Sequence, residues 1–315
     1  DLIDGITLDA LIAKRTGSLM QPQMRAKVEA ATRRQYPDGL EAYGTDALRF
    51  TFCSLASTGR DINFDVGRIE GYRNFCNKLW NASRFVLMRL EDGPIALETP
   101  DARTVFDRWM ISRLQETEQK VAEHIAQFRL DLAAQAMYEF VWHNYCDWYL
   151  ELTKPILAEA GADAATQAAT RGTLVRVLET ILRLAHPLMP FITEALWQQV
   201  APLAGKAGAT ISKAPYPIAD PDRMDPGATA DVEWLQAMII AVRTVRGELN
   251  VSPAKAIPLC LRGGSAEDRD RLDRLAPLLT PLAKLTEISH LGADDPVPPA
   301  ATQLVGTLEL LVPMA

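Results

Sequence analysis

The sequence predicts a mainly α-helical protein, an antiparallel helical bundle followed by a small α/β unit. From about residue 71 to residue 200, apolar side chains recur at helical spacing in long segments. Breakers such as Glu91-Asp92-Gly93-Pro94 separate these segments. Beyond about residue 230, short apolar runs that read as strands alternate with helical segments, a pattern typical of a small α/β unit.

Composition divides the chain into three predicted domains, residues 1–70, 71–230 and 231–315. The first mixes short helical stretches with turn signals, Pro37-Asp38-Gly39 and Thr58-Gly59-Arg60-Asp61. The second is predicted to hold helices over 71–90, from 101 onward, and over 130–157, 172–186 and 192–200, before a segment rich in Pro, Gly and Ala, 201–229. The third is predicted to hold helices over 231–249 and 267–275 and strands over 257–261, 308–312 and, more weakly, 287–291.

Charge and composition exclude several classes of protein. No apolar run approaches the roughly 18–20 residues that span a bilayer, so no membrane partner is expected. The four cysteines are scattered without a CxxC pair, which favours reduced thiols in the cytoplasm. The net charge of −7 argues against nonspecific nucleic-acid binding over the whole surface. Residues 1–90, however, hold 13 Lys and Arg against 10 Asp and Glu, so a polyanion is expected to dock near the first third of the chain.

The helix predicted over 71–90 carries two different faces. At about 100° per residue, one broad stripe is expected to face the core: Tyr72, Phe75, Cys76, Leu79, Trp80, Ser83, Val86 and Leu87. The opposite face collects Asn74, Lys78, Asn81 and Phe85, flanked by Asn77, Arg84 and Met88.

Phe85 is the unusual residue, because it projects among amides and cations. One interpretation is that its ring packs beneath a loop or the C-terminal unit. The other is a platform for a nucleobase: an exposed ring stacks on an unpaired base, amides bond base edges, and Lys or Arg neutralises phosphates. The residues alone leave both interpretations open.

Evidence for catalysis is weak. His143 and Cys146 lie three residues apart on a predicted helix and would both reach one metal ion, but no third ligand is in register. The sequence shows no glycine-rich phosphate loop, no nucleophile–base pair and no paired catalytic carboxylates. We therefore predict no catalytic residue and no metal ligand in this chain.

Several motifs resemble one family, the class Ia aminoacyl-tRNA synthetases of the valine, isoleucine and leucine group. The general motifs are GTDALRF (44–50), RDINFD (60–65), RNFCNKLWNASRFVLM (73–88), DRWMISRL (107–114), WHNYCDWYLELTKP (142–155) and HPLMPFITEALWQ (186–198). Those that resemble the valine enzymes in particular are DLIDG (1–5), KRTGSLMQPQM (14–24) and VRTVRGELNVSPAK (242–255). Together these motifs cover nearly the whole chain in the family's order.

The resemblance implies a ligase that joins valine to its tRNA, using ATP and Mg²⁺, through valyl-adenylate. Residues 1–70 would be the end of the catalytic domain and its contact with the bundle, and 71–230 the domain that binds the anticodon loop. Residues 231–315 would lead into a coiled coil. The positions matched to tRNA binding are Arg68, Asn74, Lys78, Asn81, Arg84 and Phe85.

The sequence also departs from the family's pattern. The HIGH and KMSKS signatures, the editing domain and the coiled-coil arm are absent, and the start has neither an initiator Met nor a signal peptide. We therefore expect an inactive, monomeric, cytoplasmic fragment that needs no cofactor of its own. Gly67 stands where the family has a basic residue, and Arg68 is expected to replace it. The alternatives are a helical scaffold that binds proteins through the Phe85 face, and an independent enzyme that uses His143 and Cys146.

Overall fold

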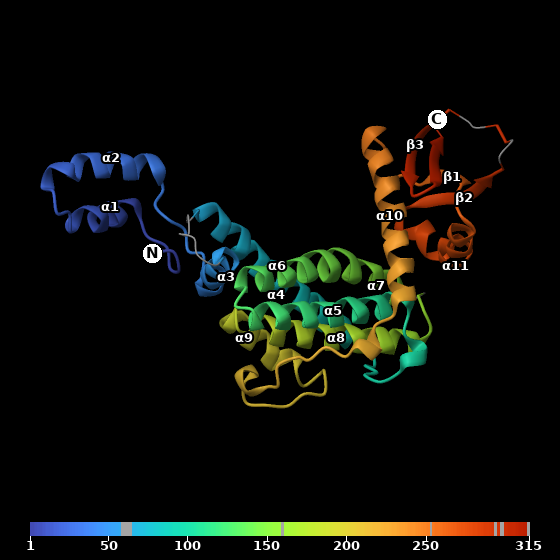
Figure 1. Cartoon of the computed structure of the whole chain (residues 1–315), viewed down its shortest axis with the longest axis horizontal. Coiled ribbons are helices and arrows are strands. Elements are labelled where there is room, and N and C mark those ends of the chain that lie inside the picture. The colour runs from blue at the N-terminus through green and yellow to red at the C-terminus, as the bar shows by residue number, and fades with distance from the viewer. Residues whose placement is uncertain (58–64, 159–160, 253, 293–294, 297–298, 314–315) are drawn as a thin grey trace. The chain divides into compact units, whose positions relative to one another are not determined.

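A computed structural model describes the chain except for residues 58–64, 159–160, 253, 293–294, 297–298 and 314–315. Two compact units are present, residues 1–224 and 225–315 (Figure 1). The first is helical, and the second packs helices against a four-stranded sheet. The predicted fold class, a helical bundle followed by a small α/β unit, is therefore confirmed. Among the described helices, none is long and apolar enough to cross a membrane.

The first unit begins with three helices: α1 (Leu8–Gly17), α2 (Arg25–Gln35) and α3 (Thr45–Leu55), with the short 3-10 helix η1 (Pro22–Met24) before α2. Ile6 and Leu40 form an isolated antiparallel bridge that ties the two ends of the α1–α2 segment together. Gly39, beside this bridge, has φ of +83°, and a Cβ there would lie 2.3 Å from the Ile6 carbonyl oxygen. Glycine is therefore required at this turn.

The bundle itself is formed by long helices that run alongside one another (Figure 1). Its helices are α4 (Val66–Glu91), α5 (Val105–Ala126), α6 (Leu130–Glu139), the π-helix η3 (Phe140–Tyr149), α7 (Leu150–Ile156), α8 (Ala164–Ala185) and α9 (Pro190–Val200). The aromatic run 138–149 supplies much of the core: Tyr145 and Tyr149 are fully buried, as are Phe75, Trp109 and Trp197 from other helices. Burial of such large rings dominates the stability of a helical core.

A buried carboxylate, that of Asp107, joins three of these helices. Asp107 closes the capping box of α5, accepting hydrogen bonds from the Thr104 backbone N–H at 3.0 Å and from the Thr104 hydroxyl at 2.8 Å. Tyr149 of η3 and Thr170 of α8 donate their hydroxyls to the same carboxylate at 2.5 and 2.9 Å. A fully buried charge is tolerated only when it is hydrogen-bonded in this way.

After α9 the chain crosses the unit in an extended segment, residues 202–224, that contains the 3-10 helices η4 (Ile211–Lys213) and η5 (Pro221–Arg223). Its anchor on α8 is Arg183, which donates to the Pro215 carbonyl at 2.8 Å and pairs with Glu179 at 2.8 Å. Trp197 donates its indole N–H to Glu179 at 2.9 Å. The Pro- and Gly-rich segment is thus fixed on the bundle.

The second unit contains α10 (Pro226–Glu248), α11 (Ala266–Leu282) and a sheet in the order β2-β1-β4-β3. Its strands are β1 (Ile257–Gly263), β2 (Leu285–Leu291), β3 (Ala300–Val305) and β4 (Leu308–Pro313). β1 pairs parallel with β2 across the α11 crossover, and the other pairs are antiparallel. The sequence prediction missed β3 and ended α11 too early, at Leu275.

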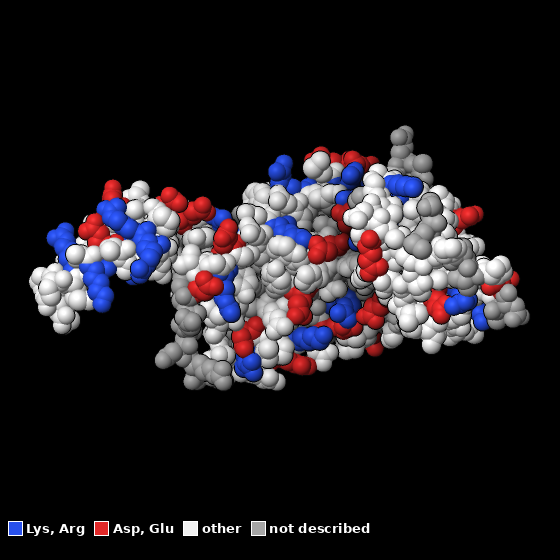
Figure 2. Space-filling model, turned by 90° about the horizontal axis from the view of Figure 1, so that it is seen from above, with Lys and Arg blue, Asp and Glu red and all other residues white. Residues whose placement is uncertain are grey.

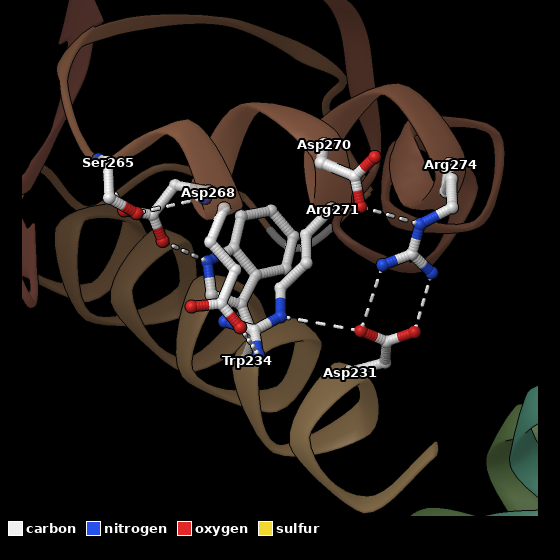
Figure 3. A network of polar contacts seen from close by, with 8 residues as sticks. Asp231, Trp234, Ser265, Asp268, Asp270, Arg271 and Arg274 are labelled. Carbon is white, nitrogen blue, oxygen red and sulfur yellow. Dashed lines mark hydrogen bonds and ion pairs between the residues drawn. The ribbon is translucent and has the colours of Figure 1, made fainter. Parts of the chain in front are cut away.

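Ion pairs join α10 to α11 within this unit (Figure 3). Asp231 accepts from Arg274 at 2.6 Å and from Arg271 at 3.3 Å, and these bonds lower the pKa of its carboxyl. Trp234, one turn further along α10, donates its indole N–H to Asp268 at 2.9 Å. Side chains on one face of each helix therefore fix their contact.

Arg246, near the end of α10, is buried and donates to backbone carbonyls. Its partners are the carbonyls of Ser252, Lys255, Ala283 and Lys284, at 3.3, 2.7, 3.1 and 2.7 Å. A surface arginine at this position would be free to contact the tRNA backbone or to pair with acids. The structure shows neither role, since the guanidinium holds the chain that follows the helix.

Candidate nucleic-acid interface

The candidate interface is the exposed side of α4. The helix begins at Val66, five residues before the predicted start at Gly71, and its N-cap Asp65 accepts the Gly67 N–H at 3.0 Å. Of the RDINFD motif, Arg60 to Phe64 lie outside the described residues. The buried arc of α4 consists of Ile69, Phe75, Leu79, Ala82, Ser83, Val86 and Leu90.

Amides and one cation occupy the opposite side of α4. Asn74, Asn77, Asn81 and Arg84 are all exposed, and Met88 is 63% exposed at the end of the same strip. These residues follow one another at intervals of three or four, so they form a continuous strip along the helix. The strip presents hydrogen-bond donors and acceptors and a positive charge to solvent.

Lys78 lies at the edge of this strip and already has a partner. Its ammonium forms an ion pair with Asp147 of η3 and lies 4.1 Å from the centroid of the Trp142 ring. His143 Nδ1 is 3.4 Å from the same carboxylate. The sequence predicted a free cation for phosphate, whereas the structure gives a half-buried, paired one.

Phe85 is half-buried, which places it between the two interpretations that the sequence left open. The Arg89 guanidinium lies 5.2 Å from its ring centroid and the Lys154 ammonium of α7 lies 5.8 Å from it. Two cations near one ring are cation–π contacts. The partly covered ring therefore lies near two positive charges, at one border of the exposed strip.

Trp80 is the residue that sequence analysis placed wrongly. It was assigned to the core stripe, but its side chain is 41% exposed. The reason is geometric: Trp80 lies about 100° from Leu79 around the helix, at the rim of the buried arc. Trp80 and Phe85 project about 140° apart, so the two rings border the strip of Asn77, Asn81 and Arg84 on opposite sides.

Two further cations of α4, Arg68 of the predicted site and its neighbour Arg73, differ in availability. Arg68, in the first turn of α4, is exposed, and the described residues offer it no ion-pair partner. Arg73 pairs with Glu41 at 2.8 Å and lies 3.8 Å from Glu70. Along α4, Arg68 and Arg84 are therefore the cations most accessible to a phosphate.

The second candidate site, His143 with Cys146, does not come together. Cys146 is buried and desolvation raises the pKa of its thiol to about 12, so it is neither a thiolate nucleophile nor a ready metal ligand. His143 is exposed and faces Asp147. Within the described part of the chain, no three His, Cys, Asp or Glu side chains gather as a metal site.

Charge is distributed unevenly over the first unit. On the face shown in Figure 2, Lys and Arg are frequent over the α1–α2 segment, at the left, with some Asp and Glu among them. The cations of α2 are Arg25, Lys27, Arg33 and Arg34. Of these, Arg33 pairs with Glu29 at 3.0 Å.

Comparison with known proteins identifies relatives over the whole chain. Residues 107–261 match the family model described as the anticodon-binding domain of tRNA ligase. The helix α4 precedes the matched range. Over 315 residues the chain is 55% identical to the valine–tRNA ligase of Stenotrophomonas maltophilia (strain K279a), covering 100% of this chain and 33% of that protein.

Two further valine–tRNA ligases match the whole chain at somewhat lower identity. That of Acinetobacter baylyi is 49% identical, covering 100% of this chain and 32% of that protein, and that of Legionella pneumophila (strain Lens) is 48% identical, covering 100% and 34%. The chain thus spans about a third of the length of these relatives. A solved LeuRS of Agrobacterium radiobacter K84, in a ternary complex with tRNA and LeuAMS, has a TM-score of 0.42 and 17% identity over 80% of this chain and 29% of that one. That likeness is too low to establish a shared fold.

Proposed function

Because the chain is related over its full length to the valine–tRNA ligases and carries their anticodon-binding domain, we propose that it is the tRNA-binding part of a valine–tRNA ligase. The bound segment would be the anticodon loop of valine tRNA, held by α4 and its neighbours. The observation that carries this proposal is the exposed strip of α4. It offers amides and a cation between an exposed ring, Trp80, and a half-buried one, Phe85, and its amides and cation lie outside the buried arc of the helix.

The chemistry of the strip suits single-stranded RNA. Asn74 and Asn81 would bond the edges of unpaired bases, since an amide both donates and accepts. Arg68 and Arg84 would neutralise phosphates, and the rings of Trp80 and Phe85 would stack on bases at the two borders. Lys78 would contribute only after leaving Asp147.

The whole ligase would attach valine to its tRNA with ATP and Mg²⁺ through valyl-adenylate. We assign no residue of this chain to ATP or Mg²⁺, because none of its motifs provides a phosphate loop or a carboxylate site. The chain would bind tRNA as a monomer in the cytoplasm.

A binding titration tests this proposal. The probes are valine tRNA, its isolated anticodon hairpin, and the same hairpin with a different anticodon, over a range of salt. Two accessible cations predict a log–log slope of about −1.4 from α4, at about −0.7 per phosphate of a single strand. Equal affinity for both hairpins, unaffected by Arg84→Ala, would refute the proposal. The matched control is Arg34→Ala on α2, which removes the same charge from an exposed helix elsewhere in the unit.

A further inference from the structure

The first unit contains a cavity that the α4 interface does not use. It lies between α5, α8 and the segment 202–224, and its volume is about 270 Å³. Ile111 and Leu114 of α5 and Val177 of α8 form one apolar wall, and Pro217 and Ile218 of the crossing segment lie on the other side. A volume of this size lies just below the usual range for small-molecule sites, about 300–1,000 Å³.

Three arginines from different elements line this cavity. Arg103 precedes α5, Arg176 lies on α8 and Arg223 ends η5, and the same three also line an adjoining hollow. Arg176 is half-buried, and its pKa is lowered first by desolvation and then by repulsion from Arg223 and Arg103.

The carboxylates near this cluster compensate its charge only in part. The Glu98 carboxylate lies 3.8 Å from Arg176 and is largely exposed, so it is a weak partner. Arg103 and Arg176 each donate to the Leu97 carbonyl, which carries no full charge. The Arg223 backbone N–H donates to the Asp220 carbonyl at 3.1 Å, but its guanidinium forms no hydrogen bond or ion pair among the described residues. A cluster of guanidinium groups with so little compensation is a site for an anion.

A carboxyl group lines the inner part of the same cavity. Glu118 of α5 is only 5% exposed, and no hydrogen bond to it is present among the described residues. Burial raises its pKa to about 7, although Arg223 and Arg183 act in the opposite direction. The Glu118 carboxyl is therefore available, within this cavity, to accept a hydrogen bond from a ligand.

We propose that this cavity binds one phosphorylated nucleoside, with its phosphate among Arg103, Arg176 and Arg223 and a donor group of its body directed at Glu118. Guanidinium groups match phosphate oxygens in bidentate geometry. The apolar walls would cover the flat base, and the limited volume excludes much more than one nucleotide. The nucleotide would be either a free mononucleotide or a single nucleotide of an RNA chain.

Calorimetric or fluorescence titration tests the proposal with three probes: adenosine 5′-monophosphate, inorganic phosphate and a short single-stranded RNA. The monophosphate should bind more tightly than inorganic phosphate, because only the former reaches Glu118. Arg223→Ala should weaken the binding of adenosine 5′-monophosphate and of inorganic phosphate by about tenfold or more, the contribution of one charge-assisted hydrogen bond. Arg223 is exposed and holds no other element, so this variant is expected to fold.

Glu118→Gln isolates the second contact. This variant should weaken the binding of adenosine 5′-monophosphate several-fold and leave the affinity for inorganic phosphate unchanged. The control variant Arg34→Ala on α2 should change neither affinity. If the short RNA displaces the monophosphate from the chain, and this competition is lost in Arg223→Ala, the occupant is a nucleotide of an RNA chain. If the RNA does not compete with the monophosphate, the occupant is a free mononucleotide. No binding of the monophosphate at about 10 mM, or equal affinity in Arg223→Ala and Arg34→Ala, would overturn the proposal. These results do not depend on α4, so they leave the proposed function to its own test.

Discussion

Lys78 of α4 and Asp147 of the π-helix η3 form an ion pair over the face of Trp142. The pair ties the candidate RNA-binding helix to the aromatic run of the bundle. It also sets a competition, because a phosphate that approaches Lys78 must replace a carboxylate already in place. The Lys78 ammonium is therefore paired and can bind a phosphate only after it has separated from Asp147.

The first prediction follows from this competition. Asp147→Asn should tighten the binding of valine tRNA and steepen its salt dependence by up to about 0.7 in the log–log slope, since Lys78 becomes available to one phosphate. Stability should change by about 1 kcal/mol or less, the usual worth of a partly exposed pair. The control is Glu29→Gln, which frees Arg33 on α2. An unchanged slope in Asp147→Asn would mean that Lys78 does not reach the RNA.

The second prediction separates the two rings at the borders of the strip. Trp80→Ala should lower the free energy of unfolding by about 1 kcal/mol or less, because much of the indole is in water. It should weaken tRNA binding by roughly 1–3 kcal/mol, the worth of one stacked base. Thermal melts and hairpin titrations measure the two effects.

Phe85→Ala is the matched variant on the other border. Because its ring is half-buried beside Arg89 and Lys154, it should cost more stability than an exposed residue but less than the roughly 3–5 kcal/mol of a core Phe. Its effect on tRNA binding should be similar to that of Trp80→Ala. A large loss of stability with normal tRNA binding in either variant would assign that ring to packing alone.

The third prediction concerns catalysis. The 315-residue chain alone should show no valine-dependent exchange of pyrophosphate into ATP, because no phosphate-binding motif is present in its sequence. In a full-length ligase, Trp80→Ala should lower charging of tRNA while leaving valyl-adenylate formation unchanged. Exchange above background by the purified chain would contradict this expectation.

The fourth prediction tests the independence of the two units. A chain that ends at Met224 should keep the cooperative melt of the bundle, since α10, α11 and the sheet form their own core after Asp225. Far-ultraviolet circular dichroism and calorimetry measure this. Loss of the cooperative transition would show that the bundle depends on residues 225–315.

The fifth prediction is a pH dependence from Glu118. Its folded pKa is about 7, above its ordinary value of 4.5, so the folded state holds a proton that the unfolded state releases first. Stability should therefore fall as pH rises from about 4.5 to 7, by at most about 1.4 kcal/mol per pH unit, and then level off. The charged groups acting on Glu118 are Arg223, Arg183 and Asp220. Glu118→Gln should flatten this decline, and an identical pH profile in both proteins would exclude Glu118 as its source.

Sequence reasoning found the architecture because long periodic segments leave little choice of structure. Sequence reasoning failed where contacts with neighbouring elements determine the burial of a side chain or the pairing of a strand. Trp80 is apolar and borders the core stripe, so periodicity alone cannot say how far the bundle covers it. The strand Ala300–Val305 has no strong apolar run; its pairing with β4 across the turn at Gly306 and Thr307 defines it.

Proline and glycine misled the prediction of two helix boundaries. α11 continues through Pro277 and Pro281, both exposed, because Leu275 and Leu279 remain buried. α8 begins at Ala164 rather than at the predicted Gly172, since Asp163 caps it and accepts the Ala165 and Thr166 N–H groups at 3.0 Å. Burial of a helical face outweighs local breaking signals when the rest of the helix is well packed.

The π-helix Phe140–Tyr149 restricts how this segment can change in length. A π-helix closes its hydrogen bonds one residue later than an α-helix, so it accommodates surplus residues along the same axis. Removing one residue from it would be absorbed by tightening to an α-helix. Removing Glu151 from the neighbouring α7 would instead turn every later side chain of that helix by about 100° and carry Leu152 out of the core.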